Sequence, residues 1–402
     1  MRSDRELADR DTVGAALLAG AALLAGAAGL SYEIIWTRLL GLVLGHEQLG
    51  VLSVLAGFFA GMAVGAGLSH RFVDRLRRPA RAFAILQGLA AAYAMVAPQL
   101  LLSFGRWLPE RIGAEPAPMR SLLAAALILL PATAALGGSL PVLVAVRRRL
   151  GAAEDGRGLA RLYAFDTLGA TLGVLATIHF MLPSLGVVQG SNLAATMGVG
   201  AAGLAWMLRE GDAGEPGEPE PAPPRADRDP DDRLQEERWL LYLVIALTGL
   251  LGLGLEVVAV RVLAQVFSGT IYSFADLLAV WLLGTALGSG VYALLRRRAG
   301  AWIDRRPATV LVVLLVLQAL VIAASALLAR AAPTLLEMLA PTPADALDFD
   351  WVKRQRGEAL TAALILGPAT LVMGACFAHL LVLIAAPARS GPGSGSAPRS
   401  IG

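Results

Sequence analysis

Long uninterrupted apolar segments, separated by short polar connections, constrain this chain more than any other feature. A helix needs ~20 apolar residues to cross a bilayer. Six such segments precede residue 209 and four follow residue 238: 13–44, 49–68, 80–104, 122–146, 162–182 and 186–208, then 239–267, 271–295, 308–328 and 360–386. The pattern predicts an all-α polytopic membrane protein with about ten transmembrane helices and the lipid bilayer as its main partner.

The composition excludes several other classes of protein. Of the 402 residues, 56% are hydrophobic and 16% are charged, which is too apolar for a soluble domain of this size. The formal charge of +3 comes from short basic clusters between apolar segments, so we expect no nucleic-acid partner. Lys353 and Cys376 are the single lysine and cysteine, and there are four histidines. We therefore expect no phosphate-binding loop, no disulfide framework, no metal site and no cofactor.

A polar stretch divides the chain into two parts. Residues 209–238 carry 11 acidic and 5 basic residues and a proline-rich run at 219–224. Such a segment buries too little apolar surface to fold. We predict a first membrane unit at 1–208, a disordered acidic cytoplasmic linker at 209–238, and a second membrane unit at 239–402.

Arginines in the connections predict the orientation. The connections 69–82, 146–161 and 296–306 hold five Arg each, whereas the short connections 45–50, 183–190 and 267–271 hold none. The positive-inside rule places the arginine-rich connections, the N-terminus and the linker in the cytoplasm. The first apolar segment continues far beyond Ala25-Gly26-Ala27, so we predict a retained helix rather than a cleaved signal peptide.

The two units resemble each other. Gly29–Arg38 aligns with Gly252–Arg261 at an offset of 223, since 256 − 33 = 223, and Gly61, Gly65 and Gly67 fall on Gly284, Gly288 and Gly290 at the same offset. The string Leu130-Pro131-Ala132-Thr133 matches Gly367-Pro368-Ala369-Thr370. We predict two six-helix repeats related as the halves of major facilitator transporters are, the second truncated to four helices. We expect the natural protein to continue with a segment like Leu162–Leu182.

Several strings resemble a known family. These are Tyr32-Glu33-Ile34-Ile35-Trp36-Thr37-Arg38, the glycine-rich segment 56–65, Gly137-Gly138-Ser139-Leu140-Pro141, and Leu162-Tyr163-Ala164-Phe165-Asp166-Thr167-Leu168-Gly169-Ala170. They are similar to the membrane region of polytopic spermidine-synthase-like proteins, also described as fused major-facilitator and spermidine synthase proteins. The resemblance implies a multi-pass protein of the bacterial inner membrane.

The resemblance also implies a soluble aminopropyltransferase-like domain after the membrane part. The glycine-rich nucleoside site and paired acids of that domain do not occur in these 402 residues, and Asp166 stands where the resemblance leads us to expect Asn. We find no catalytic motif. Aminopropyltransferase activity would depend on residues beyond Gly402.

Charged residues inside apolar segments are the candidate functional residues, because each costs ~2.5–3.5 kcal/mol or more at mid-membrane. Glu33 and Arg38 are five residues apart and so lie ~140° apart around a helix, as do Glu256 and Arg261. We predict reciprocal ion pairs between the units, Glu33 with Arg261 and Glu256 with Arg38. Packing is the alternative role for all of these charges.

Two acids stand outside this symmetry. Asp276 matches Ser53 in the first unit, and it either binds a cation or proton near Tyr272 and Trp281 or lies in water at the outer interface. Asp166 lies near the cytoplasmic end of its segment and is open to the same two interpretations. For His179 and His379 we expect hydrogen bonds between helices.

Two hypotheses of function remain open. The first is a transporter-like protein that handles a small cationic solute such as a polyamine between the units. Its candidate contacts are Glu33, Glu256, Asp276, Asp166, Tyr32 and Trp36, with Arg38 and Arg261 in structural ion pairs. The second is a membrane anchor or scaffold for a soluble transferase-like domain or partner, in which the charges serve only to pack the helices.

Overall fold

The computed structural model describes residues 2–45, 47–112, 118–150, 156–208, 232–342 and 350–385. Within these ranges the chain forms helices and no strand. The first group of helices comprises α1 (Arg2–Leu44), α2 (Glu47–Phe72), the 3₁₀ turn η1 (Val73–Arg75), α3 (Pro79–Ile112), α4 (Pro118–Arg149), α5 (Gly156–Ala176), the π-helical turn η2 (Thr177–Met181) and α6 (Leu182–Trp206). The second group comprises α7 (Asp232–Leu263), α8 (Ile271–Arg305), α9 (Pro307–Ala329), α10 (Ala332–Leu339) and α11 (Trp351–Ala385).

The described helices contain nine stretches that are long and apolar enough to cross a membrane. One of them, Arg161–Trp206, has 46 residues. As a single straight helix it would be ~69 Å long, more than twice the thickness of a bilayer core. The chain turns within it at Gly186, whose φ of 71° is in the left-handed region that favours glycine. All ten apolar segments of the sequence are thus largely helical.

The boundaries differ from the sequence prediction in two places. The linker predicted over 209–238 ends earlier, because α7 already begins at Asp232, and residues 209–231 lie outside the described ranges. The short helix α10 was not predicted at all. Its residues Ala332 and Leu336 are buried against other helices of the second group. Its eight residues are too few to give the signal of a membrane helix.

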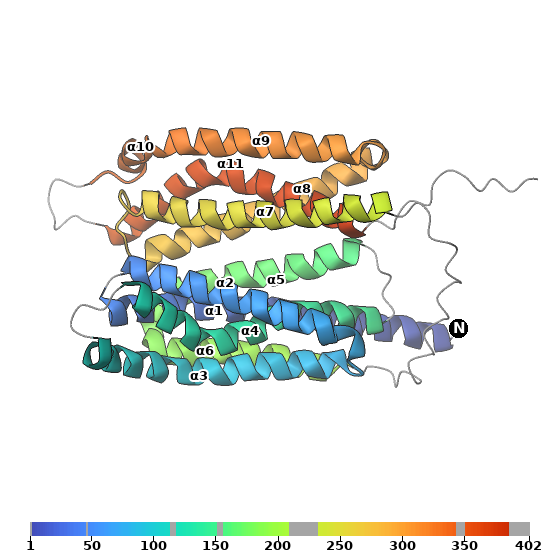
Figure 1. Cartoon of the computed structure of the whole chain (residues 1–402), viewed down its shortest axis with the longest axis horizontal. Helices are drawn as coiled ribbons and strands as arrows, with labels where there is room; N and C mark the ends of the chain where they lie inside the picture. Colours follow the sequence, from blue (N-terminus) through green and yellow to red (C-terminus); the bar gives the residue numbers. More distant parts are fainter. Residues whose placement is uncertain are drawn as a thin grey trace, which may run out of the picture.

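The helices run roughly side by side along one axis and separate into the two groups (Figure 1). In the first group α1 packs against α5, α6 and α2, while α4 packs against α2 and α3. In the second group α11 packs against α8 and α9. The groups meet mainly through α5 and α8, with a smaller contact between α5 and α11 at the rings of Tyr163 and Phe377, 5.4 Å apart.

Closely packed glycines occur at equivalent places in the two groups. In the first group, a side chain on Gly61 would collide with Thr133, and one on Gly65 with the carbonyl of Ala134. In the second group, Gly284 lies against Thr370 and Gly288 lies against Leu371 in the same way. The reverse contacts also match: Gly137 lies against Met62 in the first group, and Gly374 lies against Thr285 in the second. These positions keep the offsets 284 − 61 = 223 and 370 − 133 = 237. The crossing of α2 with α4 therefore matches that of α8 with α11.

The first and third helices of the two groups differ in how much they are covered. In α1, Gly26 lies against the backbone carbonyl of Asp166 on α5, whereas no described atom lies within 4 Å of a side chain built on the equivalent Gly249 of α7. Only 17% of the apolar window of α7 and 11% of that of α9 is buried. The second group thus presents wide apolar faces to its surroundings.

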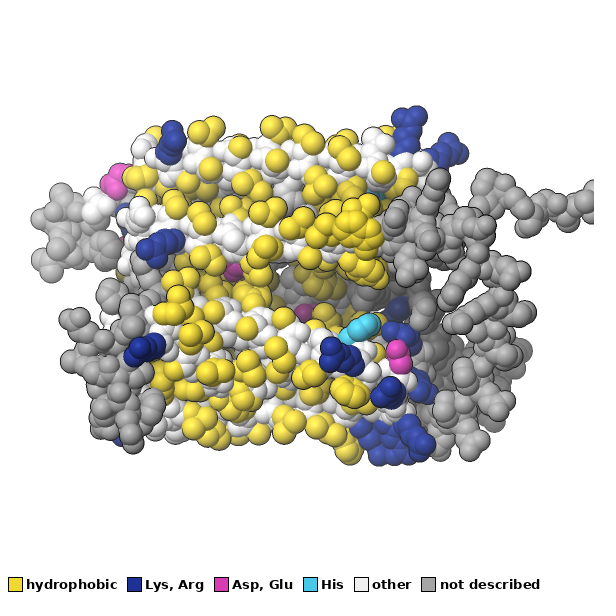
Figure 2. All heavy atoms as spheres, viewed as in Figure 1, with side chains coloured by type: hydrophobic (Ala, Val, Ile, Leu, Met, Phe, Trp, Pro, Cys, Tyr) yellow, Lys and Arg dark blue, Asp and Glu magenta, His cyan; other side chains and the backbone are white. Residues whose placement is uncertain are grey.

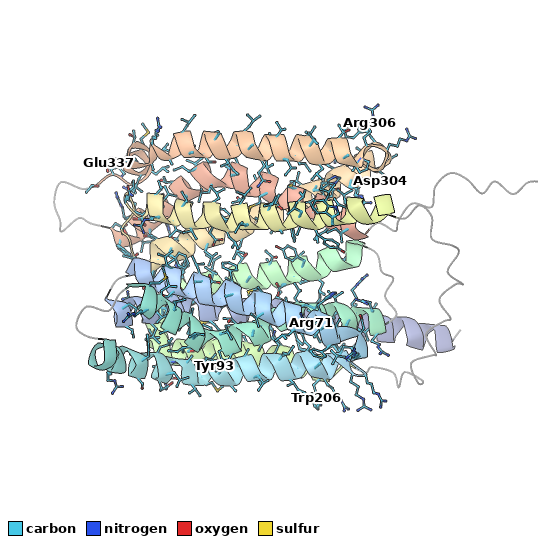
Figure 3. All side chains as sticks on the ribbon, in the orientation of Figure 1. Arg71, Tyr93, Trp206, Asp304, Arg306 and Glu337 are labelled. Carbon is cyan, nitrogen blue, oxygen red and sulfur yellow. The ribbon has the colours of Figure 1, made fainter. Side chains whose placement is uncertain are left out.

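Charged residues mark the two ends of the bundle. Asp304 and Arg306 lie at the end that also holds the N-terminus, and Glu337 lies at the other end (Figures 1 and 3). We call the first of these the basic end, after the arginines of the connections 69–82 and 296–306. An ion pair joins Asp74 to Arg148 at 3.7 Å there, and another joins Asp304 to Arg296 at 3.3 Å.

Candidate functional site

Glu33 on α1 and Glu256 on α7 are two buried acids, one in each group of helices. Their side chains are 4% and 7% exposed, and the two carboxyls lie close enough to interact electrostatically. In the described part of the chain, neither carboxyl accepts a hydrogen bond or forms an ion pair. Figure 2 shows a hollow between α7 and the first group, with acidic side chains visible inside it. This pair of buried carboxyls is the candidate site.

The reciprocal ion pairs expected between the units are not found among the residues that the structure describes. No ion pair within 4.0 Å joins Glu33 to Arg261 or Glu256 to Arg38 among the described residues. Instead, both arginines line one pocket between the groups, on the side of the two acids that is farther from the basic end. The five-residue spacing of each acid and arginine predicts that they point in different directions from the same helix. It does not determine which side chains from the two groups lie opposite each other.

Tyr32 and Trp36 lie in the core of the first group. Their rings stack with centroids 5.4 Å apart, both side chains are fully buried, and the Tyr32 hydroxyl donates to the carbonyl of Ala194 on α6 at 3.3 Å. They pack against α3, α4 and α6 rather than against the second group. Their position is that of packing residues, because they are directed away from the hollow.

Asp166 lies on α5, which forms the main contact with the second group. Its side chain is partly exposed, and its backbone carbonyl lies against Gly26 of α1. It lies about ten residues before the π-helical turn η2, the point at which α5 leads into α6. The structure therefore places Asp166 along the boundary between the groups but does not join it to Glu33 or Glu256.

Asp276 belongs to a different polar cluster, at the end opposite the basic end and within the second group. It faces α11, where the side chains of Gln355 and Glu358 interact with it. Asp276 is 6% exposed, and its Oδ2 atom has no hydrogen-bond partner in the described ranges. The side chain is therefore not in water at the outer interface, which was one of the two interpretations of the sequence. Its neighbours come from α11.

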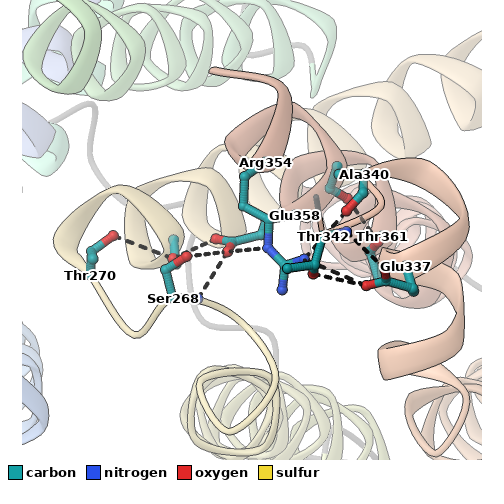
Figure 4. A network of polar contacts seen from close by, with 10 residues as sticks. Ser268, Thr270, Glu337, Ala340, Thr342, Arg354, Glu358 and Thr361 are labelled. Atoms are coloured by element: carbon teal, nitrogen blue, oxygen red, sulfur yellow. Dashed lines mark hydrogen bonds and ion pairs between the residues drawn. The ribbon is translucent and has the colours of Figure 1, made fainter. Parts of the chain in front are cut away.

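Glu358 organises that cluster, and sequence reasoning missed it. Its Oε1 accepts hydrogen bonds from the backbone N–H and the hydroxyl of Ser268 at 2.9 and 2.6 Å, and its Oε2 accepts from the Ser273 hydroxyl at 2.6 Å (Figure 4). Arg354 Nε lies 3.8 Å from Oε1. In the sequence, Glu358 belongs to a connection with charges of both signs, which is normally exposed. Its burial follows from its position on the first turns of α11, which the sequence did not predict.

Arg354 extends the same network to α10. Its guanidinium donates to the carbonyl of Ala340 at 3.3 Å and lies 4.0 Å from Glu337. The N–H and hydroxyl of Thr342 donate to Glu337, and these hydrogen bonds hold the pKa of that exposed carboxyl below its usual value. The network thereby ties α10 and the segment after it to the start of α11.

His379 confirms the expected hydrogen bonding between helices. Its Nδ1 pairs with the Tyr292 hydroxyl of α8 at 2.7 Å, and its Nε2 with the Pro307 carbonyl of α9 at 3.0 Å. A carbonyl only accepts, so Nε2 carries the proton and Nδ1 accepts from tyrosine. His179, in contrast, lies in η2 and is exposed.

Replacing His379 with phenylalanine should therefore lower the stability of the second group. The change removes two hydrogen bonds and leaves the Tyr292 hydroxyl buried without its acceptor, at an expected loss of about 1–3 kcal/mol. A thermal unfolding scan of the purified protein in detergent measures it. His179→Phe is the matched control, and an equal loss in the control would contradict the assignment.

The chain is similar to polyamine aminopropyltransferases. It is 32% identical to the "Polyamine aminopropyltransferase" of Mycobacterium tuberculosis over 190 residues, which is 45% of this chain and 34% of that protein. It is 28% identical to "Polyamine aminopropyltransferase 1" of Streptomyces coelicolor over 185 residues, 46% of this chain and 32% of that protein. A second protein of that organism, "Polyamine aminopropyltransferase 2", is 29% identical over 203 residues, which is 50% of this chain and 36% of that protein.

The chain spans about a third of the length of these curated relatives. No family model matches it, and no solved structure matches it. The polyamine-related relatives and the long apolar helices fit a spermidine-synthase-like membrane protein.

Proposed function

We propose that the protein is a multi-pass protein of the bacterial inner membrane with its N-terminus in the cytoplasm. The nine long apolar stretches of the described helices and the five arginines in each of the connections 69–82 and 296–306 support this arrangement. We assign residues 1–208 and 239–402 to two related, major-facilitator-like units joined by a cytoplasmic linker. The matching glycine contacts of α2 with α4 and of α8 with α11 support the repeat.

Between these units, we infer, the protein binds a small cationic solute such as a polyamine. The observation that carries this proposal is the pair of buried carboxyls, Glu33 and Glu256, which occupy equivalent positions of the two units and lie close enough to interact electrostatically. A buried carboxylate is stable only when a cation or hydrogen bonds compensate its charge. The described residues supply neither, and an ammonium group placed between the two carboxyls supplies both.

The names of the relatives indicate the kind of cation. A polyamine carries several ammonium groups on a flexible apolar chain. Such a molecule can place one ammonium between the two acids while its methylene groups contact the apolar walls of the hollow. Asp276 lies in a separate cluster on α11, so we leave it outside this site.

The test is binding of labelled spermidine to the purified protein in detergent. Glu33→Gln and Glu256→Gln keep the shape of each side chain and remove its charge, so each should weaken binding at least tenfold, equivalent to about 1.4 kcal/mol. Glu337→Gln, which changes an exposed acid at the end of the bundle, is the matched control. Saturable binding that both variants retain at full affinity would contradict the site, as would no binding by well-folded wild-type protein.

A second function is supported by a different observation. The chain matches about a third of the length of proteins named for aminopropyl transfer. We therefore keep the alternative that it is a non-transporting anchor or scaffold for a soluble aminopropyltransferase-like domain or partner. In that case Glu33→Gln and Glu256→Gln would change the stability of the membrane part, and spermidine would bind only when the soluble domain is present.

A further inference from the structure

A pocket lies between the two groups. Its walls come from α1, α2, α7, α8 and the turn before α8. Most lining side chains are aliphatic or aromatic, among them Leu55, Val257 and Phe274. The two charged residues that line it within the described part of the chain are Arg38 and Arg261, which are equivalent in the repeat.

The position of the pocket points to a ligand that comes from the bilayer. Its walls include α2 from the first group and α7 from the second. Both helices are long and apolar enough to span a membrane, so a lipid is already next to this pocket.

The depth of the arginines suits a lipid head group. Arg261 precedes the last residue of α7 by two positions, and Arg38 precedes the last residue of α1 by six, or ~9 Å along the helix. Arginine near the end of a membrane helix extends toward the interface, where phosphate groups lie. The apolar residues of the pocket continue from there toward the middle of the bundle, where an acyl chain would lie.

A buried polar atom supports the same ligand. Thr37 lines the pocket and is 2% exposed, and its hydroxyl has no hydrogen-bond partner among the described residues. An unpaired buried hydroxyl costs about 1–3 kcal/mol, and a phosphate oxygen is a strong acceptor for it. The exposed guanidinium of Arg261 offers two parallel donors to the same group.

We propose that this pocket binds an anionic phospholipid of the leaflet opposite the basic end. The phosphate lies against Arg261 and Arg38, and one acyl chain lies in the groove between α2 and α7. This site is distinct from the carboxyl pair: it takes an anion, and it opens to the lipid.

Native mass spectrometry of the full chain tests the proposal, with phosphatidylglycerol and phosphatidylcholine of the same acyl length as probes. Phosphatidylglycerol should be retained at least fivefold more than phosphatidylcholine, and Arg261→Gln should remove the difference. Arg330→Gln, an exposed arginine at the same end but outside the pocket, should leave it unchanged. Leu52→Trp, which fills the mouth at a half-exposed position, should lower retention without removing a charge.

Three results would overturn the proposal. Equal retention of the two lipids by wild-type protein would show that the arginines do not select an anion. Equal loss in Arg261→Gln and Arg330→Gln would show general surface attraction. Binding of glycerol 3-phosphate as tight as that of the lipid would show a site for a free phosphate. Spermidine binding should be unaffected by Arg261→Gln, so failure here is distinguishable from failure of the cation site.

Discussion

Replacing Gly65 by leucine should leave little folded protein. The first atom of any side chain at this position would overlap the backbone carbonyl of Ala134, so α2 and α4 would have to separate along their whole contact. Overpacking costs about 1–3 kcal/mol when side chains can rearrange, and a rigid backbone neighbour raises the loss beyond that range. Size-exclusion chromatography of the detergent-solubilised protein measures the folded fraction.

Gly67 provides the matched control for that experiment. It lies on the same helix two residues later, and no described atom lies within 4 Å of a side chain built there. Gly67→Leu should give the wild-type elution profile. The pair Gly288→Leu and Gly290→Leu should repeat the contrast in the second group, and a tolerated leucine at both Gly65 and Gly288 would contradict the packing and the proposed repeat.

Removing the carboxyl of Glu358 should have the second large effect. Glu358→Leu leaves three donors without an acceptor: the N–H and hydroxyl of Ser268 and the hydroxyl of Ser273. It also leaves Arg354 without its nearest carboxylate. Breaking a buried charged network in this way costs about 3–5 kcal/mol. The midpoint of thermal unfolding in detergent should fall accordingly.

Two further variants separate the charge from the shape of Glu358. Glu358→Gln keeps one acceptor oxygen and should lose less than the leucine variant. The double variant Glu358→Leu with Arg354→Leu removes the uncompensated cation and should recover part of the loss. A double variant that is less stable than Glu358→Leu alone would show that Arg354 acts mainly through Glu337 and Ala340 rather than through Glu358.

The helices were predictable from the sequence because the physical signal is local. An apolar run of about 20 residues can satisfy its backbone hydrogen bonds in a membrane only as a helix, whatever surrounds it. The repeat was visible because Gly65 and Gly288 are required by the same close approach of two backbones. The short helix α10 and the exact start of α7 carried no such signal.

The site was only partly predictable because its contacts lie between helices. The sequence indicated that Glu33 and Glu256 are equivalent and inside the bundle. It could not indicate that the two carboxyls interact, since the rotation of each helix about its own axis is set by packing against neighbours. The same reason explains why Tyr32 and Trp36, which belong to the same motif as Glu33, point into the core of the first group.

Carboxyl modification is the most direct measurement of the central claim that Glu33 and Glu256 hold one cation together. A hydrophobic carbodiimide reacts with buried carboxyls in the membrane part, and mass spectrometry reports the modified fraction of each residue. Spermidine should protect Glu33 and Glu256 in parallel, with one concentration dependence, and should leave the reaction of Asp276 unchanged. Modification of Glu33 and Glu256 at the same rate with and without saturating spermidine, in protein that remains folded, would contradict the account.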